Sequence, residues 1–429
     1  MRMQTDVLVV GGGVAGVCAA AAAARAGAKT VLVERNSFLG GAATAAAVSQ
    51  FMGWQTAGGK QIIAGLGEEI VRRLIEAGGS PGPDTGMLST GTIIDRVVFD
   101  PETLKVVLDE LVTDSGAQPL FHASVSSVKR EGSRISEVSL LTKSGDIVVE
   151  PQIVIDASGD LEVLYRAGCE MLPLKEGEQL QPASLYFKMG PGDLKAYEEM
   201  PYEDRMEIAR RGVDEGALGR FAISCYPVPG TNDAWFNVTR IAVDGTDAFA
   251  LSRAEIEGRR QALAAAKFIA ANVPAFSEAK LTGFAPQLGI RQTRRIKGRT
   301  VVSEEDLRSG RRFPDTIAIA AFPIDVHEAN GADVRLERVG GDDHYYSIPL
   351  SALIPEELDN ALVAGRGVSA DQAAFGALRI MPQAMAMGQA AGVAAALASR
   401  EGIAVARVDL TSLQEALRGG GAILEAEPA

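Results

Sequence analysis

The sequence predicts an α/β fold: a Rossmann-like domain that is discontinuous along the chain, with an α+β domain inserted into it. The first observation is a βαβ unit at the start. Residues 6–10 (DVLVV) form an apolar run typical of a buried strand, and a glycine turn leads from them into a helix of small residues, 14–26. Residues 29–34 (KTVLVE) predict the second strand. Strands joined through a helix in this way are the building unit of parallel sheets.

Two later strands show where this first domain is interrupted. Residues 153–160 (IVIDASGD) and 360–367 (NALVAGRG) each join a buried strand to a glycine turn, as at the start of the chain. Between them the character changes, because amphipathic strands alternate with polar helices. We therefore predict that residues 1–170 and 346–429 form the Rossmann-like domain and that residues 171–345 form the inserted α+β substrate domain.

Three further helices are predicted from apolar spacing and capping. The segment DPETLKVVLDELVTDSGA begins with Asp100 as a candidate N-cap and Pro101 in the first turn, and Gly116 ends it. Apolar spacing predicts another helix over 66–77. The alanine-rich segment 381–398 is too short to span a bilayer and is typical of a helix packed closely against a sheet.

Composition excludes several classes of function. The chain has 429 residues and 42 Lys+Arg against 55 Asp+Glu, a net charge of -13, which argues against a general binder of nucleic acid or of anionic membranes. Cys18, Cys169 and Cys225 are far apart and form no CxxC pair, so we expect no metal site, disulfide framework or dithiol centre. The first residues lead directly into a strand without a visible signal peptide, which favours a cytoplasmic protein.

The first glycine turn has the pattern GxGxxG, Gly11-Gly12-Gly13-Val14-Ala15-Gly16, between a strand and a helix. Gly11 allows the tight turn, Gly13 lets the backbone approach a pyrophosphate, and Gly16 lets helix and strand pack closely. The helix N-terminus offers amide donors to the phosphates. Glu34 ends the second strand and can accept hydrogen bonds from an adenosine ribose. It disfavours a 2′-phosphate, although Arg35 follows it. These features predict dinucleotide binding.

The chain resembles FAD-dependent oxidoreductases with the glutathione-reductase-like FAD-binding fold, in the branch loosely related to fumarate-reductase flavoproteins. Five segments carry the resemblance, in the family's order and over nearly the whole chain: GGGVAG with VERNSFLGGAAT, VIDASGDLEVLYRAG, PQLGIRQTRRIKG, FPIDVHE, and NALVAGRGVSADQAAFGALRIMPQAMAMGQAAGVAAALA. They imply FAD as the cofactor and specify no substrate. A second GxGxxG and a cysteine pair, which mark pyridine-nucleotide disulfide reductases, are missing from the sequence.

The resemblance implies a set of cofactor-binding positions spread along the chain, because FAD is long and must be held at separated places. They are Gly11, Gly13, Val14, Ala15, Gly16, Glu34, Arg35, Gly40, Gly41, Ala42, Thr44, Val125, Ala157, Ser158, Gly159, Gly365, Arg366, Ile380 and Met381.

Several of these positions have an expected role. Gly40 and Gly41 are expected along the pyrophosphate and flavin, and Thr44 is expected to donate a hydrogen bond there. Asp156, Gly159 and Asp160 are expected to form a second glycine turn under the adenosine end, where the Val125 backbone would pair with adenine.

Two later positions are expected at the flavin and its side chain. Gly365 and Arg366 are expected at the ribityl chain, where many relatives carry an acidic residue, so the contact at Arg366 is expected from its backbone. The helix that starts at Ile380–Met381 would point its N-terminus at the flavin N1/C2 edge, where its dipole favours negative charge.

A basic cluster lies in residues 290–299. Read as an extended strand, it places Arg291, Arg295 and most other charges on one solvated face. Arg294 falls on the other face between apolar residues, and a buried arginine needs an anionic or acceptor partner. That partner is a carboxylate of the fold, a substrate carboxylate or the reduced cofactor. Arg291 follows a glycine and is the second candidate for contact with substrate.

His327 is the candidate base. It lies in FPIDVHE, where the resemblance implies the substrate side of the flavin, and Asp325 shares its face of a strand. An Asp–His pair is a reasonable base, because the carboxylate orients the imidazole and raises its basicity. A hydrogen bond that braces the loop is the alternative role for His327.

The sequence therefore predicts an FAD-dependent dehydrogenase or oxidase that transfers a hydride from a small polar or anionic organic substrate to flavin N5. The electron acceptor (oxygen, a quinone or a carrier protein), covalent attachment of FAD and the choice between monomer and homodimer stay open. The alternatives are a flavin-containing isomerase or hydratase without net redox, an NAD dehydrogenase, and a non-catalytic FAD-binding module.

Overall fold

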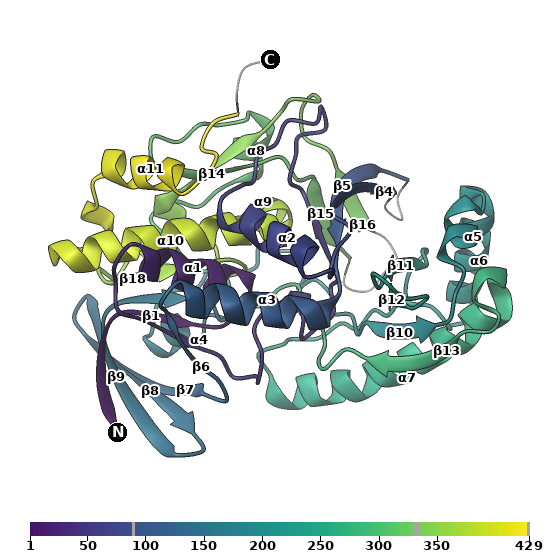
Figure 1. Cartoon of the computed structure of the whole chain (residues 1–429), viewed down its shortest axis with the longest axis horizontal. Coiled ribbons are helices and arrows are strands. Elements are labelled where there is room, and N and C mark those ends of the chain that lie inside the picture. Colours follow the sequence, from purple (N-terminus) through teal and green to yellow (C-terminus); the bar gives the residue numbers. More distant parts are fainter. Residues whose placement is uncertain (88–90, 329–333, 427–429) are drawn as a thin grey trace.

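The computed structural model describes residues 1–87, 91–328 and 334–426. Its main sheet has the order β6-β2-β1-β9-β8-β7, and β18 pairs with β9 (Figure 1). The strands β6, β2, β1, β9 and β18 are parallel, and β7 and β8 add an antiparallel hairpin. The bounds are β1 Arg2–Val10, β2 Thr30–Val33, β6 Gln118–Leu120, β7 Ser124–Glu131, β8 Arg134–Thr142, β9 Gly145–Asp156 and β18 Ala361–Val363. The predicted α/β class is confirmed.

The helices α1 (Val14–Arg25) and α10 (Met381–Glu401) lie side by side on this sheet (Figure 1). Their backbones touch, because a Cβ atom on Gly388 would overlap the carbonyl oxygen of Ala15 and one on Gly392 would overlap that of Ala19. The alanine-rich sequences of both helices follow from this contact, since larger side chains would hold the two backbones apart. Strand β1 and helix α10 are thereby joined through α1, although nearly the whole chain separates them.

A second sheet has the order β11-β12-β10-β13, with bounds Ser224–Pro227, Ala234–Asn237, Phe187–Gly190 and Lys280–Phe284. Its own core contains Phe187, Phe236 and Phe276, which pack ring to ring. The long helix α7 (Ala248–Asn272) and α6 (Tyr202–Asp214) lie around it, to the right in Figure 1.

Short strands form further small sheets. β15 (Ile324–His327) pairs with β16 (Val334–Glu337), and β5 (Ile93–Val98) pairs with both β3 (Gln50–Met52) and β4 (Pro83–Met87). The other elements are α2 Leu66–Glu76, α3 Pro101–Asp114, α4 Glu162–Arg166, α5 Leu194–Glu199, α8 Glu304–Arg308, β14 Thr316–Ala320, β17 Tyr346–Pro349, α9 Gln372–Leu378 and α11 Leu410–Gly419. Residues 302–324 share a hydrophobic core with α1 and α10, although they lie within the predicted insertion. The domain limits themselves stay a prediction.

The helix predictions are confirmed and one strand prediction is wrong. Asp100 caps α3 with its carboxylate, which accepts hydrogen bonds from the backbone N–H groups of Glu102 and Thr103. Residues 290–299 form no strand; only isolated bridges tie them to other segments, such as Ile296 to Met171. The directions of its side chains therefore depend on local contacts, and the side chains do not alternate between two faces as in a strand.

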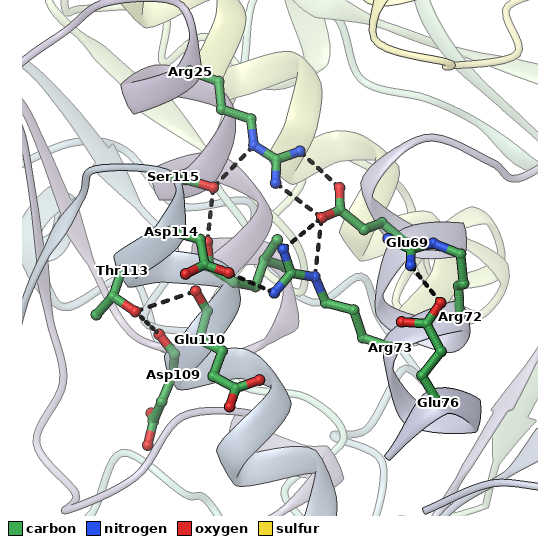
Figure 2. Close-up of polar contacts among 11 residues, drawn as sticks. Arg25, Glu69, Arg72, Arg73, Glu76, Asp109, Glu110, Thr113, Asp114 and Ser115 are labelled. Atoms are coloured by element: carbon green, nitrogen blue, oxygen red, sulfur yellow. Dashed lines mark hydrogen bonds and ion pairs between the residues drawn. The ribbon is translucent and has the colours of Figure 1, made fainter. Parts of the chain in front are cut away.

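A polar network joins α1, α2 and the C-terminal end of α3 (Figure 2). The Glu69 carboxylate of α2 accepts hydrogen bonds from both Nη atoms of Arg25 at 2.7 and 2.9 Å, and from Nε of Arg73 at 3.1 Å. Arg25 also donates to Ser115 Oγ, and Arg73 donates to Asp114. The hydrogen bond from Arg25, followed by weaker effects of Arg73, lowers the pKa of Glu69 although partial burial opposes it.

We expect Glu69→Ala to lower the free energy of unfolding by about 1–2 kcal/mol, because two guanidinium groups lose their shared acceptor. Chemical denaturation of the variant measures this. Glu76→Ala is the matched control in the same helix: Glu76 is exposed and pairs with Arg72 alone, so the loss should stay below about 0.5 kcal/mol. Equal losses in the two variants would contradict a special role for Glu69.

Candidate active site

One cavity of about 710 Å³ lies where the parallel strands of the main sheet end and the second sheet begins. Residues that directly follow four strands line it: Gly11 after β1, Glu34 after β2, Ala157 after β9 and Ala364 after β18. All four positions are at the carboxyl ends of the strands. Open α/β sheets bind their ligands at this edge.

The first glycine turn shapes one wall of the cavity. Gly11 has φ +101°, and a Cβ on it would lie 2.5 Å from the Ala157 carbonyl oxygen. A Cβ on Gly16 would overlap the Gly11 carbonyl oxygen, so glycine there allows α1 to start directly on β1. A Cβ on Gly13 would instead point into open space, with Gly41 Cα, at 3.9 Å, as its nearest protein neighbour. Gly13 therefore leaves room for a ligand, whereas Gly11 and Gly16 make room for the protein's own backbone.

Glu34 lies at the end of the cavity that follows β2. Its carboxylate is 6% exposed and accepts backbone N–H groups from Gly12 at 2.7 Å and from Asn36 at 2.8 Å. These bonds fix the carboxylate in place and use one lone pair on each oxygen. The remaining lone pairs can accept hydroxyl groups of a ligand.

The second glycine turn is held by an ion pair. Arg366 donates from Nη2 to Asp160 Oδ1 at 2.7 Å, and Thr293 donates to the same oxygen at 2.9 Å. The other terminal nitrogen of Arg366, Nη1, is buried and has no hydrogen-bond partner within the described residues. Arg366 and Asp160 both line the cavity, so this ion pair fixes part of its wall.

Positive charge gathers on the far side of the cavity, where Arg220, Arg291 and Arg379 all line it. Arg291 donates from Nη1 to the Pro182 carbonyl at 2.6 Å and to Ser184 Oγ at 2.9 Å, both of which are neutral acceptors. Burial, followed by repulsion from Arg379, lowers the pKa of Arg291 to about 9. Burial also lowers the pKa of Arg379. Among the described residues, Arg291 therefore has no carboxylate partner, whereas Arg379 pairs with Asp325.

Asp325 is the carboxylate of β15 that faces these arginines. It accepts Nη2 of Arg379 at 2.8 Å and lies 3.2 Å from Nε2 of His327. Burial acts to raise the pKa of Asp325, but His327, Arg379 and Arg291 together outweigh it and leave the pKa below its ordinary value. Asp325 is therefore ionised at neutral pH.

His327 is buried, at 8% exposure, and both ring nitrogens have partners. Nδ1 lies 3.2 Å from Nη2 of Arg240, and a guanidinium can only donate, so Nδ1 accepts and the proton resides on Nε2 facing Asp325. Burial, with smaller contributions from Arg291 and Arg220, lowers the pKa of His327 to about 3, although Asp325 opposes this shift. Asp325 thus acts to raise the basicity of His327, as predicted, but burial and the neighbouring guanidinium groups outweigh this one carboxylate.

Comparison with protein families gives a match over residues 6–417 to the model described as FAD dependent oxidoreductase. The chain belongs to the FAD-dependent oxidoreductase family. The cofactor is therefore FAD, as predicted. Comparison with curated proteins gives no match.

Solved structures of flavoproteins share the fold of this family member. A geranylgeranyl bacteriochlorophyll reductase-like protein from Thermoplasma acidophilum aligns with a TM-score of 0.53 and 13% identity, over 97% of this chain and 83% of that one. The p-nitrophenol 4-monooxygenase of Pseudomonas putida DLL-E4 aligns with a TM-score of 0.51 and 10% identity, over 100% and 91% of the two chains. At these identities the likeness establishes the fold.

FAD fits the residues that the cavity offers. The open space at Gly13, at the N-terminus of α1, suits a pyrophosphate, and the fixed carboxylate of Glu34 suits a ribose. The cavity is lined by most of the predicted cofactor positions: Gly11, Gly13, Val14, Ala15, Glu34, Arg35, Gly40, Gly41, Ala42, Ala157, Ser158, Gly159, Gly365, Arg366, Ile380 and Met381. Their individual contacts with FAD stay predictions.

Three predicted cofactor positions do not line the cavity. Gly16 faces the Gly11 carbonyl. The Thr44 hydroxyl donates to the Leu39 carbonyl at 2.6 Å, so it holds the loop before it and is not directed at a ligand. Val125 lies in β7 and pairs with Leu140 of β8.

The structure brings Arg291, Asp325 and His327 together at the cavity and leaves Arg294 outside it. The Arg294 guanidinium stacks 3.8 Å from the ring centroid of Tyr165 and donates to the Asp160 carbonyl. Arg294 therefore has neutral partners and not the anion that strand parity predicted. The parity argument failed because residues 290–299 form no strand.

Sequence reasoning missed Arg220 and Arg379. Arg379 directly precedes Ile380, the N-cap of α10, so its position beside a predicted cofactor helix was an available signal. Arg220 lies in an irregular segment between α6 and β11, where no local pattern marks it. Within the described residues, no helix is long and apolar enough to cross a membrane, and no group of three or more His, Cys, Asp or Glu is arranged to hold a metal.

Two alanine substitutions in the GxGxxG turn should separate ligand space from packing space. Gly13→Ala should keep the stability of the apoprotein within about 0.5 kcal/mol and lower FAD affinity about tenfold or more, because its methyl group enters open cavity. Gly16→Ala should destabilise the apoprotein by about 1–3 kcal/mol through the overlap with Gly11. Denaturation of the apoproteins and titration with FAD measure both effects. An unstable Gly13→Ala apoprotein would argue against this division.

His327 should make the fold sensitive to acid. Its folded pKa of about 3 lies below the ordinary 6.5, so the unfolded chain binds more protons between these values and stability falls as the pH falls through this window. His327→Gln should recover on the order of 1–2 kcal/mol of the loss between pH 7 and pH 5, measured by denaturation of the apoprotein. Parallel slopes for His327→Gln and wild type would rule out this assignment.

Proposed function

We propose that this FAD-dependent oxidoreductase is a dehydrogenase or oxidase that removes a hydride from a small organic anion. The observation that carries the proposal is the largely buried guanidinium of Arg291, which among the described residues donates only to neutral acceptors and lies near the ion pair of Arg379 with Asp325. A buried charge without a counter-ion is costly, so a ligand that supplies negative charge stabilises the site. The planar guanidinium groups favour a carboxylate, which can accept two parallel hydrogen bonds.

The helix α10 supports the placement of substrate beside the flavin. Its N-cap Ile380 and first residue Met381 line the same cavity as Arg291 and His327, and Arg379 lies one residue before the cap. When bound, FAD supplies a two-electron acceptor that takes a hydride at N5. The partial positive charge at the helix N-terminus would stabilise negative charge that develops at the nearby ring edge.

The anion also changes what His327 can do. Arg291 and Arg220 contribute to the low pKa of His327, and a carboxylate bound between them offsets their charge. Substrate binding therefore raises the pKa of His327 and improves it as a base. Proton uptake at Nδ1 requires the Arg240 contact to open, because Arg240 donates to that nitrogen in the present arrangement. Asp325 remains ionised and stabilises the protonated ring.

A flavin-containing isomerase or hydratase is the second candidate, because it would need the same cavity and the same anion site. Product analysis distinguishes the two, since net oxidation changes the redox state of the product and isomerisation does not. The cytoplasmic location stays a prediction of the sequence.

The test of the proposal is an anaerobic screen of small organic acids, each beside its neutral amide, with loss of the oxidised flavin absorbance as the readout. We expect bleaching by one or more acids and none by the amides. The proposal would be contradicted by a protein that releases no FAD on denaturation and gains none on incubation. Bleaching by neutral compounds alone would also contradict it.

Arg291→Gln should raise the KM or Kd for the acid identified about 10- to 100-fold, because a charged hydrogen-bond donor is lost. Steady-state kinetics and binding titrations measure this at matched FAD content. Arg299→Gln is the control from the same basic segment: Arg299 is exposed near Asp359, away from the cavity, and its loss should leave KM within about twofold. Equal effects in both variants would contradict a direct role for Arg291.

A further inference from the structure

An apolar surface lies beside the charged one on the face of the β15–β16 pair that lines the cavity. In the antiparallel register, His327 lies opposite Val334 and Asp325 lies opposite Leu336. Residues directly opposite each other point to the same face of such a pair. All four line the cavity, whereas Arg335, between the two apolar residues, is exposed and pairs with Glu304 and Glu337. One strand therefore presents polar groups to the cavity and its neighbour presents apolar groups.

Further residues with large side chains line the same cavity as Val334 and Leu336. Ile223, Met206 and Tyr226 also line the cavity, and they come from the segment before β11, from α6 and from β11 itself. Tyr226 stacks on Tyr186 with ring centroids 6.1 Å apart and an interplanar angle of 18°. Burial, with smaller effects of Tyr226, raises the pKa of Tyr186, so this ring stays neutral.

The two surfaces have different requirements. Arg291, whose acceptors are neutral, gains from an anion, while Val334 and Leu336 gain from contact with carbon. A small polar acid such as acetate would satisfy the arginines and leave the apolar surface facing solvent. A molecule with an apolar part beside its carboxylate would satisfy both, at the spacing of adjacent strands.

We propose that the substrate is an organic acid with an apolar body, and that Val334, Leu336 and Ile223 bind that body while Arg291 and Arg379 bind the carboxylate. This inference rests on the proposed function, because it assigns the chemical class of the substrate to the same site.

The experiment measures the affinity of the FAD-loaded protein for four probes: acetate, hexanoate, phenylacetate and 2-phenylethanol. Binding is followed by the change in the flavin absorption spectrum, so turnover is not required. We expect hexanoate and phenylacetate to bind about tenfold or more tightly than acetate, because their apolar bodies leave water on binding. We expect 2-phenylethanol to bind about tenfold more weakly than phenylacetate, since it lacks the charge.

The variant Leu336→Asn should lower the affinity for hexanoate and phenylacetate about tenfold and that for acetate less than twofold. Leu336→Ala is the second variant, in case the amide disturbs the strand pair, and FAD content with thermal unfolding checks both. Ile256→Asn, at an exposed apolar residue of α7, is the control and should change none of the affinities.

The outcomes separate the two levels of the proposal. Equal affinities for acetate and phenylacetate, or equal loss of both in Leu336→Asn, would overturn the apolar subsite and leave the anion site intact. Binding of 2-phenylethanol as tight as phenylacetate would overturn the anion site and with it the proposed function. Binding of none of the four probes would overturn the substrate class.

Discussion

Direct contacts between the backbones of β1, α1 and α10 fix the position of the cavity in this protein. α1 starts directly on β1 because Gly16 has no side chain between it and the Gly11 carbonyl, and α10 lies on α1 because Gly388 and Gly392 have none either. These contacts bring the N-termini of both helices to one edge of the sheet. Arg366 and the glycine turn after β9 then close the same edge. The cavity is therefore formed by the packing of the protein itself and does not depend on a bound ligand.

Electrostatics divide that cavity into two ends. At one end, Glu34 is a fixed acceptor and Gly13 leaves open space, which suits the neutral hydroxyls and the phosphates of FAD. At the other end, Arg220, Arg291 and Arg379 face Asp325. Repulsion among guanidinium groups and burial both act on the pKa of Arg291, and the same charges act on His327. The groups that would bind a substrate anion also control the protonation of the nearest candidate base. Binding and proton transfer are thus coupled through a single set of charges.

Much of the fold and of the cofactor end could be predicted from sequence, because both depend on local signals. The strands β1 and β2, the cap at Asp100 and the GxGxxG turn are each specified by residues within a few positions of one another. The substrate end could not be predicted to the same depth. Strand alternation favours Arg294 over Arg291 for a buried anion, but the segment forms no strand and Arg294 stacks on Tyr165 outside the cavity. At the cofactor end, the Thr44 hydroxyl likewise donates to the nearby Leu39 carbonyl and not to a ligand. Arg220 carried no signal at all, because it lies in an irregular segment that only the second sheet positions.

Four features can be predicted from the amino-acid sequence: the α/β class, the place of each glycine turn, the FAD cofactor through its family motifs, and the proximity of Asp325 to His327. These follow from local backbone conformation and from short spacings along one strand. Three properties follow from the tertiary structure alone: which arginine lines the cavity, the neutral state of His327 that burial causes, and the position of the apolar residues of β16 opposite Asp325 and His327 of β15. Such properties depend on burial and on charges contributed by segments far apart in the chain, so no local pattern contains them.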